Sequence, residues 1–342
     1  MAQDLGLPLH APDHGTGALD AFANTLVLEA IVKRLQETSG PTTLAMGAVT
    51  DGQFLKRSGT TITSSAVAAG VNVFGDGSDG ALSVTSGTTT LSRDGFYTTV
   101  SVTGGALATA GFRVFASTSI TVGASGTIRH NGGNGGNGGV GVGGSAGAAA
   151  ASGTLAASAA GAVGRGTNSA GTNGTSVSNS LGGAGGAGGA STGTVNAGGS
   201  GGTATSITAA QGTAPRILDH ALTGALIALS GVVSIAGGAG GGSGGCTSAA
   251  NGSGGGGGGG GTMVLASPTI SNSGTISCNG GNGGAGSAAA QGRGGGGGGG
   301  CLILIAQSYS GSGTYTATGG TVSGTGNGGV AGSDGTVYQL TV

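Results

Sequence analysis

Glycine dominates this sequence, and its pattern constrains the fold more than any other feature. The chain has 88 glycines and 5 prolines among 342 residues, a fraction typical of low-complexity or disordered chains. Disorder normally goes with low hydrophobicity and high net charge. Here 36% of residues are hydrophobic, 6% are charged and the net charge is −1. A chain of this kind must pack against itself or against other copies, or it aggregates.

The glycines are arranged in two ways. Uninterrupted runs at residues 254–261 and 294–300 lead into apolar strand patterns that start at Thr262 and Cys301, and a further strand pattern starts at Thr336. Elsewhere glycine is phased in Gly-Gly-x triplets, as in Asn131–Gly139 and Ala184–Gly189. A long glycine run is usually a flexible linker. Recurrence, triplet phasing and the strands that follow indicate ordered structure here.

Triplet phasing is what a polyproline-II-type helix requires, because it has three residues per turn and makes no internal hydrogen bonds. Its amides must therefore pair with neighbouring helices, and glycine supplies the bare faces that close packing needs. Gly-Gly-x suits a peripheral helix with x pointing outward, whereas pure glycine suits a central one. We expect a bundle of polyglycine-II helices with residues 254–261 and 294–300 inside.

The segment from Phe74 to Ile128 alternates short β-type patterns with Ser/Thr/Gly turns about every ten residues. Such spacing fits either a sandwich or the rungs of a β-solenoid. One motif, Ser125–Gly136, returns as Ser273–Gly284 and, more loosely, as Ser230–Gly241. The expected fold class is mostly β, with sandwich-like or solenoid strands feeding a polyglycine helix bundle. The clearest strand patterns before residue 130 are Ala81–Val84, Thr99–Val102, Phe112–Phe115 and Ile120–Val122.

The first 40 residues differ from the rest of the chain. Thr16 can cap a helix whose apolar stripe includes Leu19, Phe22 and Leu26, and Gly40-Pro41 would end it. We expect this helix to pack against copies of itself or to dock into a larger particle; the alternative is an amphipathic helix folded onto its own chain. The predicted organisation is an attachment and oligomerisation helix, a neck with turns and short strands, a β-rich domain and a distal polyglycine and strand domain, at residues 1–40, 41–73, 74–130 and 131–342.

Candidate catalytic chemistry is sparse. Asp76 and Asp79 form the closest acidic pair and suggest either a small Ca²⁺ loop or an Asp-Gly turn; the loop lacks the further oxygen ligands and the bidentate Glu of a calcium site. His10 and His14 have metal-like spacing, but Pro12 opposes the helix that it needs. We expect no catalytic residue, no metal site, no cofactor and no enzymatic activity.

Other function classes also lack their signatures. The ten Lys and Arg residues are scattered, so no basic patch for nucleic acid forms. The least polar stretch, residues 221–236, is too short to span a bilayer, and the N-terminus has no charged-then-apolar leader. Three cysteines without CxxC spacing, Cys246, Cys278 and Cys301, are expected to be small apolar fillers in a protein made in a reducing cytoplasm.

A family resemblance accompanies these patterns. Asp51–Gly59 resembles a short segment found near the start of many tailed-phage fibre and structural proteins. Residues 74–139 and the alternation of glycine runs and strands from 254 to 342 are similar to the glycine-rich distal domains of bacteriophage tail-fibre and receptor-binding tip proteins. The resemblance implies a virion protein, homotrimeric or capping a trimeric fibre, whose loops touch the host; some members fold as stacked polyglycine-II helices.

The expected function is therefore a non-enzymatic tail fibre or spike, assembled in the host cytoplasm into the virion. Residues 1 to about 50 would trimerise and attach to other virion proteins, and the glycine-rich body would project. The stretches Gly139–Leu181 and Ser191–Thr213 are the expected outward-facing variable surface; the receptor-binding residues are unknown, and the receptor would be a host surface polysaccharide or outer-membrane protein. Alternatives are a structural head or collar fibre or decoration protein, a polysaccharide depolymerase spike, and an ice- or glycan-binding protein.

Overall fold

The computed structural model covers the full chain and divides it into two units, Met1–Val71 and Asn72–Val342. It describes residues 73–192, 196–206, 235–247 and 250–342, residues 217, 218 and 222, and the backbone of short strands between 45 and 66 and between 226 and 233. The helix expected between residues 16 and 40, and with it His10 and His14, lies outside the described residues.

The first unit contains a small sheet in the predicted neck. Strands β1 (Ala45–Met46), β2 (Gln53–Ser58) and β3 (Thr61–Ala66) pair in the order β1-β3-β2. Strands β2 and β3 form an antiparallel hairpin in which Ser58 lies opposite Thr61. The predicted pattern of turn, strand, turn and strand start over residues 51–62 is confirmed by this hairpin.

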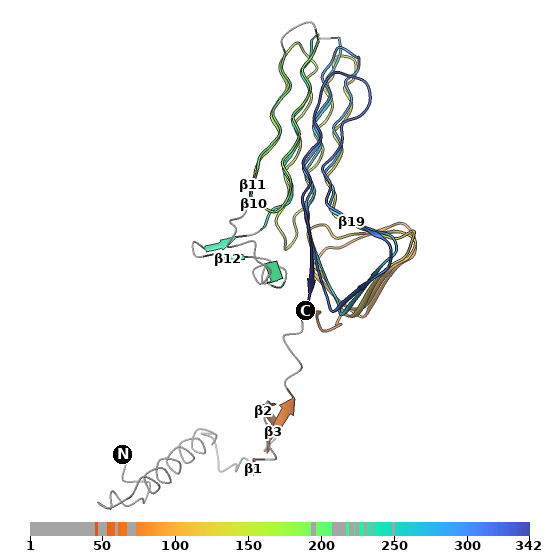
Figure 1. The fold of residues 1–342 in the computed structure, drawn as a ribbon, viewed down its shortest axis with the longest axis vertical. Helices are drawn as coiled ribbons and strands as arrows, with labels where there is room; N and C mark the ends of the chain where they lie inside the picture. The colour runs from red at the N-terminus through yellow and green to blue at the C-terminus, as the bar shows by residue number, and fades with distance from the viewer. Residues whose placement is uncertain are drawn as a thin grey trace, which may run out of the picture. The chain divides into compact units, whose positions relative to one another are not determined.

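The second unit is built on parallel strands that stack coil upon coil, and Figure 1 shows the stack as a triangular profile. Five coils each place one strand on a first side and the next on a second side. The first side contains β4 (Ala81–Val84), β6 (Gly95–Val102), β8 (Val114–Val122), β15 (Thr269–Asn272) and β18 (Ser308–Ser310). The second side contains β5 (Thr88–Thr90), β7 (Ala106–Ala108), β9 (Thr127–Arg129), β16 (Thr275–Ser277) and β19 (Thr314–Thr316).

The third side carries the strands that follow the glycine runs. Strands β14 (Thr262–Ala266), β17 (Cys301–Ala306) and β20 (Thr336–Thr341) pair in parallel, with Thr262 beside Cys301 and Cys301 beside Thr336. The predicted strand starts at 262, 301 and 336 are thus confirmed, and the three strands are direct neighbours. Because every pairing in the stack is parallel, the strands form rungs rather than the antiparallel sheets of a sandwich.

Apolar side chains fill the inside of the stack in register. Ile120 lies beside Ile270, and Ile128 beside Ile276, so equal side chains meet on successive coils. Strands β14 and β17 are buried along their whole length because a second core covers their outer face. That burial on both faces explains why these two strands are continuously apolar in sequence. The second core includes Phe74, Phe115, Leu155, Ile217, Ile235, Val264, Ile303 and Ile305.

The two close copies of the repeated motif stack directly: Thr275, Ile276 and Ser277 pair with Thr127, Ile128 and Arg129. The looser third copy does not join them. Its strand β13 (Gly231–Val233) instead pairs antiparallel with β12 (Leu226–Ala228). The predicted equivalence of Ser230–Gly241 with the other copies is therefore wrong for the strand. Which strands pair depends on where the chain returns to the stack of coils. The residues of this motif do not specify that position.

The chain leaves the stack after β9, β16 and β19, and each time it returns through a glycine-rich segment into β14, β17 or β20. In Figure 1 these excursions run side by side away from the coils. We call the described residues of 130–206, 235–261, 278–300 and 317–335 the glycine bundle. Apart from the short parallel pair β10 (Val177–Ser180) and β11 (Ala204–Ser206), its described segments form neither α-helix nor β-strand, only isolated bridges.

The run Gly254–Gly261 is buried at every residue and hydrogen-bonded to segments on all sides. Its amides donate in rotation to three neighbours: Gly254, Gly257 and Gly260 to Gly292, Gly295 and Gly298; Gly255 and Gly258 to Gly136 and Gly133; Gly256 and Gly259 to Ala162 and Ala159. Its carbonyls accept from three other segments, around Gly147, Gly241 and Gly281. The three segments that accept from the run and the three that donate to it make six surrounding segments.

The run Gly294–Gly300 is likewise buried and is bonded to the segments around Gly186, Ala239, Gly281 and Val330 and to Gly254–Gly260. The expected interior position of both runs is confirmed. A third interior segment, residues 236–246, breaks the rule that triplets lie at the periphery, because Ala239 is fully buried. Its amides bond to the segments around Thr172, Gly186 and Gly257, and these neighbours enclose it.

Candidate functional surface

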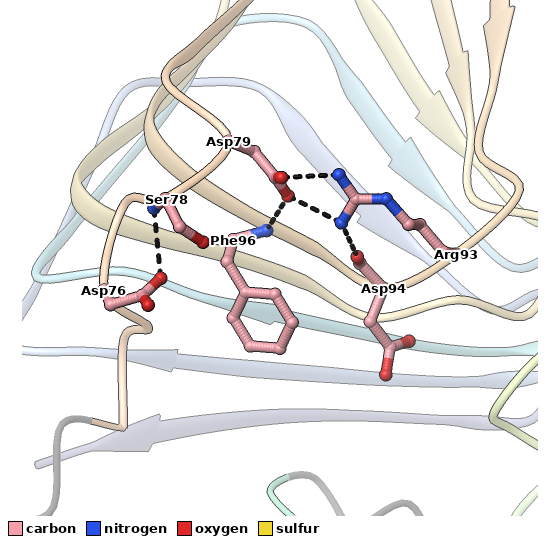
Figure 2. Close-up of polar contacts among 6 residues, drawn as sticks. All are labelled: Asp76, Ser78, Asp79, Arg93, Asp94 and Phe96. Atoms are coloured by element: carbon pink, nitrogen blue, oxygen red, sulfur yellow. Dashed lines mark hydrogen bonds and ion pairs between the residues drawn. The ribbon is translucent and has the colours of Figure 1, made fainter.

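The acidic pair singled out in the sequence lies at the first coil, where Asp76 and Asp79 make separate polar contacts (Figure 2). Asp76 Oδ1 accepts from the Ser78 amide at 3.0 Å, and Asp79 Oδ2 accepts from the Phe96 amide at 2.8 Å. Arg93 donates to both carboxylate oxygens of Asp79. These contacts form an Asp-Gly turn at Asp76 and an ion pair between Asp79 and Arg93.

The same contacts determine the charge state of the two carboxylates. The Ser78 amide lowers the pKa of Asp76, and Arg93, followed by the Phe96 amide, lowers the pKa of Asp79. Both carboxylates therefore stay ionised at neutral pH. A second ion pair joins Arg113 to Asp94 at 2.6 Å, and the Arg113 guanidinium lies 5.5 Å from the Phe115 ring centroid. Figure 2 also shows Arg93 donating to the Asp94 carbonyl. We interpret these contacts as clasps between successive coils.

The remaining described acid, Asp334, accepts from the Gly319 amide at 2.8 Å. Within the described ranges no group of three or more His, Cys, Asp or Glu side chains gathers as metal ligands would. Surface hollows lined by described residues include the following two. One, of about 480 Å³, is lined by Gly75, Asp76, Ser78 and Phe96; the other, of about 380 Å³, is lined mainly by alanines and glycines together with Arg129, His130 and Asn131.

His130 is buried where the chain leaves the coils for the glycine bundle. Its Nδ1 and Nε2 atoms lie 2.9 and 3.0 Å from the carbonyl oxygens of Thr262 and Ala151. Burial lowers the pKa of His130, against the opposing pull of these two carbonyls. A neutral imidazole has a single N–H, so it satisfies one carbonyl at a time. We interpret His130 as a joint between the coils and the bundle.

All three cysteines are buried, and none forms a disulfide. Cys278 directly follows β16, and Cys301 is the first residue of β17, so both lie where the glycine bundle meets the coils. Burial raises the pKa of the Cys278 thiol, and it raises the pKa of Cys301 to about 12. Thiols of this kind are not nucleophilic at neutral pH. The burial of Cys278 and Cys301 fits the predicted role as small apolar fillers, whereas the buried Cys246 thiol also donates to the Asn251 carbonyl oxygen at 2.8 Å.

The outer surface of the bundle carries a ladder of asparagines that the sequence reading missed. The Oδ1 atoms of Asn131, Asn134 and Asn137 accept the amides of Asn279, Asn282 and Ala285 at 2.7–2.8 Å. Asn279 and Asn282 accept in turn from the Thr318 and Thr321 amides. The signal was present, because both rows repeat Asn every third residue. The ladder ties three peripheral segments together where no backbone carbonyl is paired with these amides.

The turns farthest from the coils form what we call the distal end: the described residues of 139–142, 164–169, 190–196, 246–252, 286–293 and 322–328. Its turns are joined by side-chain hydrogen bonds, among them Asn196 to Asn168 and the Cys246 carbonyl, and Gln291 to Thr247. Val140 and Val142 are 84% and 64% exposed there. The turns are fixed relative to one another and present a surface of mixed polarity.

The stretch Gly139–Leu181, expected to be a loop-like, outward-facing surface, has many exposed residues but runs as segments of the glycine bundle rather than as a free loop. Within this stretch the amides of Gly144, Gly147, Ala159 and Gly171 bond to other bundle segments. Only the turns at 139–142 and 164–169 belong to the distal end. Of the second expected surface, Ser191–Thr213, residues 191–192 and 196 lie at the distal end, residues 197–206 run back along the bundle, and residues 193–195 and 207–213 lie outside the described ranges.

Comparisons with known proteins found no match for this chain. No protein-family model, no curated protein and no solved structure matches the chain. In the part of the chain that the structure describes, no helix has the length and apolar character that a membrane span needs. Functional inference for this protein therefore rests on its own residues and geometry.

Proposed function

We propose that this chain is a non-enzymatic virion protein, a bacteriophage tail fibre or spike whose glycine bundle projects outward and whose distal end contacts the host-cell surface. The observation that carries the proposal is the interior of the bundle. Glycine runs that are buried and hydrogen-bonded on all sides hold a set of turns in fixed positions at one end. A stiff shaft with a shaped end suits attachment to a surface.

The proposal includes the conformation of the shaft: its segments are polyglycine-II helices. The amides of Gly254–Gly260 point to three neighbours in rotation and return to the same neighbour every third residue. A helix with three residues per turn produces that rotation, and it needs partners outside itself because it makes no internal hydrogen bonds. A strand would alternate between two directions instead. Packing with six neighbours requires bare faces, which only glycine supplies.

The remainder of the proposal concerns attachment. The N-terminal region would join other virion proteins and form a homotrimer, and the distal end would meet a host polysaccharide or outer-membrane protein. Trimeric presentation would multiply weak contacts. A non-enzymatic role is supported by the described carboxylates, because Asp76, Asp79, Asp94 and Asp334 are all held in structural contacts. A depolymerase would need a pair of acids open to a groove.

Immunogold labelling of purified particles from the encoding strain tests this proposal. An antibody against residues 72–342 should label projections, and label at a fibre tip would favour the host-contact role. Label spread over the head or confined to the collar would favour the alternative of a decoration protein. Release of reducing sugar from host polysaccharide by the purified chain would contradict the non-enzymatic role, and an absence of label on particles would end the virion assignment.

A further inference from the structure

Two arginines stand at the distal end at the same level of the glycine bundle. Arg165 ends one bundle segment, and Arg293 lies at the start of another. The segment between them connects both: the Ser253 amide donates to the Arg165 carbonyl at 2.9 Å, and the Gly254 amide donates to the Gly292 carbonyl at 3.0 Å. The two arginines therefore flank Ser253–Gly254 on different sides, next to the turns of the distal end.

Neither guanidinium is neutralised by a described residue. Among the described residues, the side chains of Arg165 and Arg293 make no hydrogen bond and no ion pair, and Nε of Arg293 is buried without a partner. The arginines of the coils differ, because Arg93 is paired with Asp79 and Arg113 with Asp94. Because no described group pairs with them, the terminal nitrogens of the Arg165 and Arg293 guanidiniums are free to meet an anion.

No acid at the distal end compensates these charges. The only described carboxylate of the bundle is Asp334, which lies two residues before β20 at the opposite end and accepts from the Gly319 amide. Around the arginines stand amides and hydroxyls, including Asn168, Thr247 and Gln291, and Gln291 is locked to Thr247 by hydrogen bonds at 2.7 and 2.9 Å. The distal end thus combines two uncompensated positive charges with fixed polar groups.

From this arrangement we propose that the distal end binds an anionic polysaccharide through Arg165 and Arg293. The ligand class rests on the proposed function, because it specifies what the distal end meets on a cell. A guanidinium presents paired donors that match the oxygens of a sulfate, phosphate or carboxylate group. Each exposed contact is weak and screened by salt, so affinity comes from a polymer that repeats its charges and from several copies of the chain.

Binding of the purified full chain to immobilised dextran sulfate, with neutral dextran of equal length beside it, tests the proposal. Wild type should bind dextran sulfate but not neutral dextran, and this binding should weaken as the NaCl concentration rises. The double variant R165Q/R293Q should bind about tenfold more weakly, and R165Q alone about threefold, from the lost charge contacts. R165Q changes an exposed side chain, so it serves if the double variant fails to fold.

Arg129 provides the matched control, because it is an exposed arginine on β9, away from the distal end, and its side chain has no ion-pair partner among the described residues. R129Q should leave binding within about twofold. Equal loss in R129Q would mean that any arginine suffices and would overturn the distal site. Equal binding to neutral dextran, or binding that does not weaken with salt, would overturn the anionic ligand.

A cell-binding arm separates this inference from the proposed function. The same proteins are applied to cells that the parent particle infects, and bound protein is measured by fluorescence. Wild type bound with R165Q/R293Q released supports both ideas. Wild type and double variant bound equally would overturn the arginine site and leave the attachment role intact. No binding of wild type would contradict the attachment role, and the dextran sulfate result would still decide whether the site prefers anions.

Discussion

The coils and the glycine bundle belong to one unit of the chain but are held together by different means. In the coils, side chains such as Ile120, Ile270 and Leu302 pack in register inside the stack. In the bundle, the interior is backbone, and segments are joined by amide-to-carbonyl bonds between glycines. The first kind of interior tolerates exchange of similar side chains, whereas the second has no side chain that can move aside. Stability in the two regions should therefore respond to opposite kinds of mutation.

The largest effect is expected from adding a single methyl group to the bundle interior. A Cβ on Gly257 would overlap the carbonyl group of Gly281, so Gly257→Ala forces main-chain segments apart. We expect a loss of about 4 kcal/mol or more in unfolding free energy, because every neighbour is backbone. Thermal unfolding followed by circular dichroism measures it.

Gly139→Ala is the matched control, because the nearest atom to its added Cβ is the Val142 carbonyl oxygen at 4.0 Å. This variant should unfold at a temperature close to that of wild type. Similar melting temperatures for Gly257→Ala and Gly139→Ala would show that the interior is not backbone-packed and would erase the contrast between the two regions.

Removing side-chain volume should matter most in the coils. Leu302 is fully buried inside the stack, so Leu302→Ala leaves a cavity and should lower the unfolding free energy by about 3 kcal/mol. Leu302→Met keeps the volume and should cost less than about 1.5 kcal/mol. Chemical denaturation measures both. If Leu302→Ala and Leu302→Met lose the same unfolding free energy, the stability of the coils does not depend on the side-chain volume that fills their core.

A smaller effect is expected at the asparagine ladder on the bundle surface. Asn282 Oδ1 accepts from the Thr321 amide at 2.8 Å, and Asn282→Ala removes that acceptor. Because the site is exposed and water can replace the bond, the loss should be about 1 kcal/mol. Asn282→Asp retains an acceptor and should stay near wild type. If Asn282→Asp loses as much as Asn282→Ala, the oxygen is not the stabilising atom.

The joint between the two regions should respond to pH. Burial lowers the pKa of His130 below its unfolded value of 6.5, so the folded state favours the neutral ring. The associated stability is complete above pH 6.5 and is lost as pH falls through the folded pKa. Melting temperature measured downward from pH 7.5 should fall more for wild type than for His130→Gln, which cannot titrate. Parallel curves would show that His130 does not set this dependence.

Local patterns in the sequence predicted the local structure well. The runs Ala81–Val84 and Thr99–Val102 form strands as expected, and the strand starts at Thr262, Cys301 and Thr336 are correct because an apolar run after glycine is a strong signal. The Asp76–Asp79 turn followed from its Asp-Gly steps. The two glycine runs were also placed inside the bundle, since bare segments can be surrounded on every side.

The predictions that failed concern residues whose hydrogen-bond partners are distant in the sequence. Gly-Gly-x triplets were expected at the periphery, but Ala239 in such a triplet is buried and enclosed by the segments around Thr172, Gly186 and Gly257. The stretch Gly139–Leu181 looked like a loop because its Ala, Ser and Thr residues show no strand pattern, and only its bonds to other segments reveal its place. In the asparagine ladder, Asn134 and Asn282 are 148 positions apart, and Asn282 and Thr321 are 39 apart. The role of Arg165 and Arg293 emerged once the bundle placed them at one end.

Amide hydrogen exchange of the two interior glycine runs tests the central claim most directly, because it reports whether those amides are bonded. Mass spectrometry of peptides covering Gly254–Gly261 and Gly294–Gly300, with the adjoining β14 and β17 as internal references, supplies the measurement. We predict that the glycine amides exchange as slowly as those of the two strands. Exchange at the rate of an unstructured chain would mean that the runs are tethers, and the backbone-packed shaft would be wrong.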